Sequence, residues 1–310
     1  MDLIRLALPP TSPPRPLRRP AIAIGNFDGV HRGHAALIAA ARAASDGGEV
    51  CALTFEPHPV QILAPAVAPV RLTPERRKLE LLAAAGVDVA IVVPFTTALA
   101  AMPAPAFVHD VLGGALGARH VVVGADFTYG QGRAGTIATL RTDGAAGGFA
   151  VTVLAPVEVD GAIASSTRVR AALRAGDLAQ AAAVLGRRFD VDGRVVRGAG
   201  RGKGLGIPTA NVAPDGDLAI APGIYAVTLT EGGVVRPAVA SLGTNPTFVE
   251  RGALTLEVFV LDFDGDLYDA DVRVTFVARL RDEARYDTVD ALLAQIAIDL
   301  ADARAIFATA

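Results

Sequence analysis

The sequence predicts an α/β domain with a parallel sheet in its first half and an antiparallel β-barrel with a terminal helix in its second half. Two observations carry this prediction. Up to about residue 160, short apolar runs alternate with helical stretches, and after about residue 190 strand candidates follow one another with Gly, Pro or Asp between them. The length of 310 residues and the hydrophobic content of 52% are enough for two buried cores.

Strands are expected in the first half wherever a short apolar run stands between turn residues. They lie at residues 21–24, 50–55, 89–93, 121–123 and 151–154, with helices expected over 34–44 and 75–85. Strands that alternate with helices pair in parallel and carry helices on both faces of the sheet. Residues 1–20 are expected to form an irregular arm rather than a secretory signal, because their apolar stretch is short and prolines follow it.

The second half opens with two helices, at 166–173 and 178–185, and Asp177 and Gly186 are expected to cap the second of them. The strand candidates that follow predict an antiparallel barrel. A last helix is expected after Thr288, because apolar residues recur there at the helical period. The predicted domains are residues 1–186 and 187–310. The barrel strands are expected at residues 191–196, 225–230, 235–242, 254–261 and 272–277.

Composition narrows the classes of function. The net charge of −3 argues against a nucleic-acid partner, which would need a basic face. A single cysteine, Cys51, cannot form an internal disulfide, so we expect a cytoplasmic protein with Cys51 in its core rather than in catalysis. The uncharged run 89–108 contains three prolines and is read as a strand, a loop and a short helix, so no membrane span is expected. Homo-oligomerisation is left open.

A first candidate site is the string GNFDGVHRGH, residues 25–34, which follows one predicted strand and opens a helix. Its glycines let the backbone approach a phosphate, and a helix start offers unpaired N–H groups and a partial positive charge. His31 and His34 are three residues apart and share a helical face, where they could stabilise charge during attack at an α-phosphorus. The alternative, a surface turn with two unrelated histidines, would explain one histidine but not the whole string.

A second piece of this site is expected at SSTRVR, residues 165–170. Hydroxyl groups at a helix start can cap the helix or donate to phosphate, and an arginine one turn later can reach the same anion. A plain cap with solvated arginines is the alternative for this segment taken alone.

A second candidate site is the Gly-rich stretch 198–206 with the IPTAN sequence that follows it. Successive backbone N–H groups in such a loop can form an anion nest, and the oxygens of Thr209 and Asn211 suit Mg²⁺. Glu257 stands in an otherwise apolar strand and is the candidate general base for phosphorylation of an alcohol. The alternatives are a flexible hairpin loop and a salt-bridged or solvated carboxylate at a sheet edge.

The strings GNFDGVHRGH, TFEPHP (54–59), VVVGADFTYG (121–130) and SSTRVR resemble the adenylyltransferase module of bacterial bifunctional riboflavin kinase/FAD synthetases. The resemblance implies a Rossmann-like, HxGH-type nucleotidyltransferase fold in which FMN attacks the α-phosphate of ATP, with Mg²⁺, to give FAD and pyrophosphate. It places Phe55, Pro57, His58 and Asp126 on the flavin side. It assigns ATP and phosphate contacts to Gly25, Asn26, Phe27, Asp28, His31, Gly33, His34, Ser165, Ser166, Thr167 and Arg170.

The strings VDGRVVRGAGRGKGLGIPTAN, GIYAV, SLGTNPTF and LEVFVLDFDGDLY resemble the riboflavin kinase module of the same family. This resemblance implies a six-stranded barrel that binds riboflavin and ATP with Mg²⁺. Thr209 and Asn211 would hold the metal, Glu257 would deprotonate the ribityl 5′-hydroxyl, and residues 279–288 would close over the flavin with the last helix. ATP would be bound by Gly200, Gly202, Lys203, Gly204 and Gly206.

Three positions depart from the family pattern: Asp269 stands where glycine is expected, Tyr286 where phenylalanine is usual and Phe259 where histidine is frequent. Three hypotheses follow: an enzyme of two reactions, an enzyme with one live module, and a non-catalytic flavin sensor or RNA-linked regulator. A dead module should have lost the histidines or the SST segment, or else Asn211 or Glu257, and all are present. The two-reaction hypothesis is therefore preferred.

Overall fold

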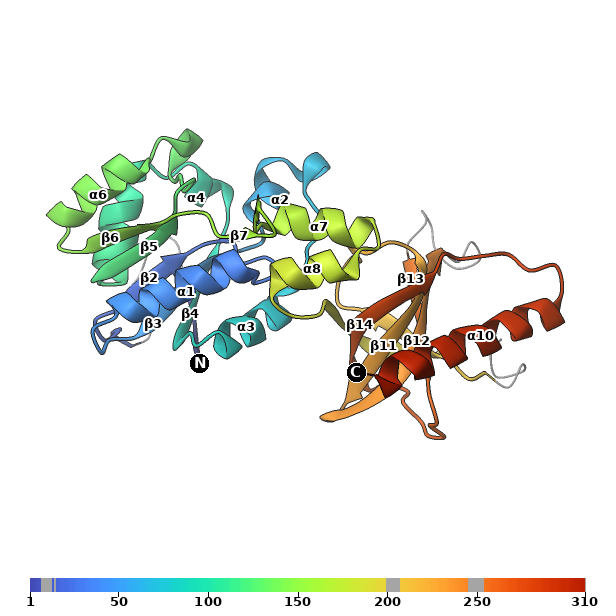
Figure 1. Cartoon of the computed structure of the whole chain (residues 1–310). Coiled ribbons are helices and arrows are strands. Elements are labelled where there is room, and N and C mark those ends of the chain that lie inside the picture. The colour runs from blue at the N-terminus through green and yellow to red at the C-terminus, as the bar shows by residue number, and fades with distance from the viewer. Residues whose placement is uncertain (7–12, 14, 199–206, 245–253, 310) are drawn as a thin grey trace. The chain divides into compact units, whose positions relative to one another are not determined.

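The structure, a computed structural model, describes residues 1–6, 13, 15–198, 207–244 and 254–309 (Figure 1). The chain forms two compact units. The first contains Met1–Pro69 and Glu75–Ser166, and the second contains Val70–Pro74 and Thr167–Ala310. The predicted ATP-binding positions Gly200, Gly202, Lys203, Gly204 and Gly206 lie outside the described residues.

The first unit contains a six-stranded parallel sheet in the order β1-β4-β3-β2-β5-β6. The chain runs from β2 through β3 to β4 on one side of β2, and then crosses to β5 and β6 on the other side. The prediction of a parallel α/β domain is confirmed. The strands are β1 (Asp2–Arg5), β2 (Ala21–Ile24), β3 (Val50–Glu56), β4 (Val89–Pro94), β5 (His120–Gly124) and β6 (Ala150–Leu154).

Helices cover both faces of this sheet because successive strand residues point to opposite sides. Ala21 and Ala23 pack into one apolar cluster with α1 and α3, whereas Ile22 and Ile24 pack into another with η2 and α6. The helical elements are α1 (Arg32–Ala44), α2 (Pro59–Leu63), η1 (Pro65–Val67), α3 (Glu75–Ala84), α4 (Thr97–Ala100), α5 (Ala104–Ala106), the π-helix η2 (Phe107–Ala115), η3 (Gln131–Arg133) and α6 (Ile137–Ala146). A hairpin of β7 (Glu158–Val159) and β8 (Ala162–Ile163) follows.

The start of the chain corrects one prediction. Residues 1–20 were expected to be irregular throughout, but β1 pairs in parallel with β4 at the sheet edge. Ile4 and Leu6 are buried in the core, before the first proline at Pro9. The strand therefore forms because its apolar side chains gain burial against β4, which a count of prolines does not reveal.

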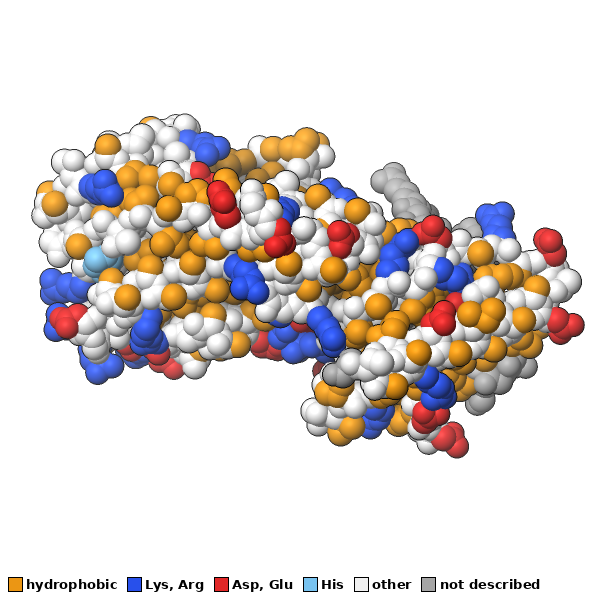
Figure 2. Space-filling view, viewed as in Figure 1, with side chains coloured by type: hydrophobic (Ala, Val, Ile, Leu, Met, Phe, Trp, Pro, Cys, Tyr) orange, Lys and Arg blue, Asp and Glu red, His pale blue; other side chains and the backbone are white. Residues whose placement is uncertain are grey.

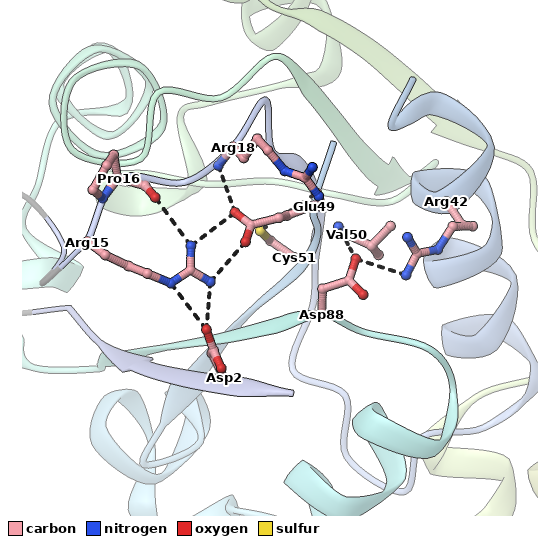
Figure 3. Close-up of polar contacts among 9 residues, drawn as sticks. All are labelled: Asp2, Arg15, Pro16, Arg18, Arg42, Glu49, Val50, Cys51 and Asp88. Carbon is pink, nitrogen blue, oxygen red and sulfur yellow. Dashed lines mark hydrogen bonds and ion pairs between the residues drawn. The ribbon is translucent and has the colours of Figure 1, made fainter. Parts of the chain in front are cut away.

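Three acidic side chains at the amino ends of neighbouring strands are held by arginines (Figure 3). Arg15 pairs with Asp2 at 2.7 Å and with Glu49 at 2.9 Å, and Arg42 pairs with Asp88 at 2.9 Å. Asp2 belongs to β1, while Glu49 and Asp88 directly precede β3 and β4. This network ties the segment around Arg15 to the sheet, at the edge opposite the carboxyl ends of the strands.

The second unit contains α7 (Ser166–Arg174), α8 (Leu178–Leu185) and a closed antiparallel barrel in the order β10-β13-β12-β11-β14-β9. Asp177 and Gly186 cap α8 as predicted. The six-stranded barrel is confirmed, although β10 was not predicted from the strand pattern. Its strands are β9 (Asp190–Val196), β10 (Ala210–Pro214), β11 (Gly223–Glu231), β12 (Val234–Thr244), β13 (Leu254–Val260) and β14 (Asp271–Arg281).

The terminal helix α10 (Val289–Ala308) begins after the predicted cap, since the Thr288 side chain accepts the backbone N–H of Ala291. It packs Ala303 against an apolar cluster that includes Ile224 and Val239 of the barrel. Both α7 and α8 lie in the compact unit of the barrel, and the domain boundary at 186/187 stays a prediction.

The surface carries charged side chains of both signs (Figure 2). On the face shown in Figure 2, Lys and Arg side chains are interspersed with Asp and Glu side chains over both units. Within the described part of the chain, no helix has the length and apolar character needed to cross a membrane. Cys51 is buried as predicted, and burial, reinforced by the nearby charges of Glu49 and Asp88, raises the pKa of its thiol to about 12.

Two candidate active sites

The loop between β2 and α1 carries the first candidate site and is held in a strained shape. Phe27 and Val30 have φ values of 50° and 42°, in the left-handed region that a β-branched residue such as Val30 rarely adopts. Both side chains are nevertheless buried, and the Val30 N–H donates to the Phe27 carbonyl at 3.2 Å. Packing therefore stabilises a conformation that costs on the order of 1–3 kcal/mol per strained residue. Such strain is typical of functional loops.

His31 and His34 cap the start of α1 reciprocally. The Nδ1 atom of His31 accepts the backbone N–H of Gly33 at 3.1 Å, and the Nδ1 atom of His34 accepts the backbone N–H of His31 at 3.3 Å. A neutral imidazole whose Nδ1 accepts must carry its proton on Nε2. Both rings therefore keep an Nε2–H donor. A Cβ at Gly33 would lie 3.0–3.1 Å from the His31 ring, so a larger residue there would press on this ring.

Electrostatics keep His34 neutral. Burial lowers the pKa of His34 well below its usual value, and the charges of His31 and Lys78 lower it further. At neutral pH His34 therefore offers an uncharged N–H donor beside the N-terminus of a 13-residue helix. That combination suits a polyphosphate anion.

Ser166 of the predicted segment 165–170 contacts the same loop from far along the chain. The Ser166 hydroxyl donates to the Asp28 carbonyl at 2.8 Å, which joins residues 138 positions apart. Ser165 lies next to this contact. Thr167 and Arg170 belong to the second compact unit, where Arg170 is 6% exposed and its Nε donates to the Val70 carbonyl at 2.6 Å. The phosphate-binding roles of these four residues stay predictions.

The residues predicted to contact the flavin lie just after β3 and β5, the two strands that flank β2. Phe55 and Pro57 lie at the end of β3, and Asp126 lies in the exposed turn after β5. Ligands of open α/β sheets bind where the strand order reverses, which here is between β2 and β5. His58 caps α2, because its Nδ1 accepts the Val60 N–H at 3.3 Å. This cap gives His58 a structural role, which its place between Pro57 and Pro59 also suggests.

The second candidate site lies on the barrel, where polar residues of three strands are in register. Glu257 of β13 is directly opposite Asn211 of β10 and Ser241 of β12, so the three share one face. The neighbours Leu256 and Val258 are buried on the other face, as the predicted alternation requires. The Thr209 hydroxyl lies 3.5 Å from Glu257 Oε2 and completes the row.

This donor set fits Mg²⁺ bound largely through a nucleotide. Thr209, Asn211 and Glu257 supply hydroxyl, amide and carboxylate oxygens within one small region. Among the described residues there is no cluster of three or more His, Cys, Asp or Glu side chains that could hold a metal ion by itself. Mg²⁺ retains water and phosphate ligands and needs few protein oxygens, which is the chemistry that these side chains offer.

Comparisons with known proteins match both halves of the chain. The family model for FAD synthetase matches residues 14–168, and the family model for riboflavin kinase matches residues 185–307. The bifunctional riboflavin kinase/FMN adenylyltransferase of Pseudomonas fluorescens is 41% identical over 297 residues, which is 95% of each chain. This chain belongs to the bifunctional riboflavin kinase/FMN adenylyltransferase family. The proteins of the same name from Escherichia coli (strain K12) and Bacillus subtilis are 40% and 35% identical.

The alignment with the Escherichia coli protein covers 92% of each chain. The alignment with the Bacillus subtilis protein covers 91% of this chain and 90% of that protein. A solved structure described as a macrolide-efflux protein from Streptococcus pneumoniae has a TM-score of 0.83 and 28% identity, and the match covers 98% of this chain and 99% of that one. The bifunctional family therefore accounts for the whole architecture, and the two candidate sites lie in different modules of it.

The structure shows the surroundings of the three residues that depart from the family pattern. Asp269 adopts a φ of 62°, the left-handed conformation for which glycine is suited and which Asp tolerates better than most residues. Phe259 packs in the apolar cluster beneath α10, where an aromatic ring is well accommodated. The guanidinium carbon of Arg281 lies 5.9 Å from the centroid of the Tyr286 ring.

Two further groups were not found from the sequence. Glu283, in the segment after β14, has its carboxylate against Gly243, and burial raises the pKa of Glu283. Lys78 is buried beside the first site. A signal for Lys78 was present, because it stands three and four residues before Leu81 and Leu82 on the apolar stripe of α3.

Proposed function

We propose that this chain makes FAD from riboflavin in two ATP-dependent steps, each at its own site. The barrel phosphorylates riboflavin to FMN, and the α/β unit transfers AMP from ATP to FMN. The observation that carries this proposal is the coexistence of two intact polar constellations: the reciprocally capped pair His31 and His34, and the cross-strand pair Asn211 and Glu257. The family membership supports the same pairing of reactions.

In the adenylyl transfer, a phosphate oxygen of FMN attacks the α-phosphorus of ATP, and the bond to the β-phosphate breaks to release pyrophosphate. The Nε2–H groups of His31 and His34 and the N-terminus of α1 donate to the phosphate oxygens on which negative charge grows. No covalent enzyme intermediate is needed, because positioning and charge compensation are sufficient. Ser165 and Ser166 extend the same surface, with Thr167 and Arg170 as further candidate phosphate ligands.

In the kinase reaction, Glu257 accepts the proton of the ribityl 5′-hydroxyl as its oxygen attacks the γ-phosphorus of ATP, and ADP leaves. Thr209 and Asn211 would hold Mg²⁺, which neutralises charge on the phosphates when it is bound. The barrel positions these groups rigidly, since Glu257 and Asn211 lie on paired strands. We place both reactions in the cytoplasm, in line with one buried cysteine, and expect no nucleic-acid partner.

The deciding experiment is to incubate the purified full-length protein with riboflavin, ATP and Mg²⁺ and to separate the flavins over time. We expect FMN to appear first and FAD to follow. FMN without FAD would contradict the two-reaction proposal and favour one live module, and no product at all would favour a flavin-binding regulator.

Independence of the two sites is tested by Glu257→Ala. This variant should abolish FMN formation from riboflavin yet still convert supplied FMN to FAD. Glu231→Ala is the matched control, since Glu231 is another barrel carboxylate, at the end of β11 and paired with Arg236. Loss of both reactions in Glu257→Ala but not in the control would contradict separate sites.

A further inference from the structure

Lys78 is a charged side chain enclosed in the first unit, only 1% exposed. Lysine is rarely buried to this degree unless its charge is paired, because removing an ammonium group from water is costly. It lies on α3, on the same stripe as the buried Leu81 and Leu82. Packing alone therefore does not explain a buried ammonium group at this position.

The ammonium group of Lys78 joins two loops of the first candidate site. Its Nζ lies 2.5 Å from Glu56 Oε1 and donates to Thr54 Oγ1 at 3.1 Å and to the Asn26 carbonyl at 3.4 Å. The Thr54 hydroxyl also donates to the Asn26 carbonyl, at 3.1 Å. An ammonium group has three N–H donors, so Lys78 can bind several acceptors at once. Asn26 belongs to the loop after β2, and Glu56 ends β3.

These contacts connect the nucleotide side of the site to the flavin side. Asn26 opens the loop that leads to His31, whereas Glu56 directly precedes Pro57 and His58. We propose that Lys78 is a positioning residue for adenylyl transfer, which with Glu56 holds the loop after β2 in register with the loop after β3. This inference rests on the proposed function of the α/β unit. Lys78 acts through these loops, since protein acceptors already take up its ammonium group.

Lys78 also sets the charge around His34. The charged groups that act on His34 are His31, which is stacked on its ring, and Lys78 from α3, which is paired with Glu56. The positive charge of Lys78 favours the neutral form of His34. Only the neutral ring can accept the His31 N–H through Nδ1, so Lys78 helps to keep the cap of α1 intact.

The two partners of the ion pair therefore have opposite effects on His34. Removal of the Lys78 charge leaves the Glu56 carboxylate nearby, and the pKa of His34 should rise. Removal of the Glu56 charge leaves Lys78 uncompensated, and the pKa of His34 should fall. A purely structural role for the pair would give no such difference in sign.

The test uses full-length Lys78→Met and Glu56→Gln, with Arg76→Met as the matched control. Arg76 is a cation of the same helix whose side chain is 55% exposed. The pH profile of kcat/KM for FAD formation from FMN and ATP is measured, and the His34 ring is titrated by NMR, with its signal assigned through His34→Gln. Riboflavin phosphorylation in the same samples reports on folding of the other unit.

We expect Lys78→Met to lower kcat/KM by about 100-fold, the scale of a misplaced reactive geometry. Its acidic limb and its His34 titration should move to higher pH, and those of Glu56→Gln to lower pH, while Arg76→Met stays like the wild type. Shifts of the same sign in both variants, or no shift in either, would overturn the inference. If Lys78→Met does not fold, Glu56→Gln is compared with Lys78→Arg, which keeps the positive charge. The inference then requires the His34 titration to move in Glu56→Gln and to stay unchanged in Lys78→Arg. A wild-type protein that makes no FAD refutes the proposed function instead, and the NMR titration still tests Lys78.

Discussion

The imidazole rings of His31 and His34 lie stacked with their centroids 3.7 Å apart, and each ring accepts a backbone N–H through Nδ1. The cap thus uses Nδ1 of each ring as an acceptor, so the proton of each neutral ring is on Nε2. Replacement of either histidine by glutamine should lower kcat for FAD formation by about 10²–10³, as expected when one donor to a developing oxyanion is lost. Riboflavin phosphorylation should be unchanged in the same sample. An equal fall in both reactions would indicate a general loss of folding instead.

Gly243 of β12 contacts only the carboxylate end of the Glu283 side chain, in the segment after β14. Glu283 is exposed, so its carboxylate can swing aside when Gly243→Ala adds a Cβ. The cost should be within about 0.5 kcal/mol, and riboflavin phosphorylation should change by no more than roughly twofold. Steady-state kinetics of the two separate reactions provide the measurement. A tenfold or larger fall in kinase activity would show that the Glu283 side chain cannot move away.

Asp269 offers a test of backbone conformation. Its φ of 62° costs an L-residue about 1–2 kcal/mol, whereas glycine adopts it without strain. Asp269→Gly should therefore be neutral or slightly stabilising, and Asp269→Val should destabilise the barrel by about 1–2 kcal/mol. Urea unfolding followed by a signal from the barrel measures both. Equal stability of the two variants would show that the left-handed conformation is not retained in solution.

The Arg15 network predicts how the stability of the first unit depends on pH. Burial alone would raise the pKa of Glu49, but hydrogen bonds from the Arg15 side chain and the Arg18 backbone N–H outweigh it and hold that pKa below its usual value. For Asp88, bonds from Arg42 and the Val50 N–H have the same net effect against burial. A carboxylate whose pKa is lowered by folding stabilises the fold above its unfolded pKa, and this contribution is lost as pH falls through the folded value.

The free energy of unfolding should therefore fall as the pH drops from about 5 into the acidic range. Glu49→Gln should lower stability at neutral pH and flatten this dependence, because the glutamine does not titrate. Denaturant unfolding at several pH values provides the measurement. A variant with the same slope as the wild type would show that Glu49 does not contribute to it.

The sequence predicted elements whose signal is local, and missed those that depend on a distant partner. The apolar runs at β2 to β6 are long enough to identify buried strands, and Thr288 and Asp177 have the chemistry of caps. By contrast, only the two central residues of β1, Leu3 and Ile4, are apolar, and β1 is a strand because β4 lies beside it. Likewise β10 follows a Gly-rich stretch and ends at Pro214, so its pairing with β9 and β13 could not be inferred from the pattern.

The same division holds for the first site. His31 and His34 are close in sequence, and their shared helical face followed from a spacing of three residues. Lys78 contacts a carbonyl 52 positions earlier, so its relation to Asn26 exists only after the sheet has formed. The Ser166 contact to Asp28 spans 138 positions, and only the family resemblance placed these segments together.

Closure of the barrel has a consequence for the order in which the protein can fold during synthesis. The first strand, β9, pairs with the last, β14, and Asp192 holds Arg273 across this seam through two bonds of 2.6 and 2.9 Å. A nascent chain that has not yet produced β14 therefore has open strand edges on β9 and β11, which are templates for aggregation. The parallel sheet is complete once β6 has emerged, so it can form while the barrel still waits for its final strand.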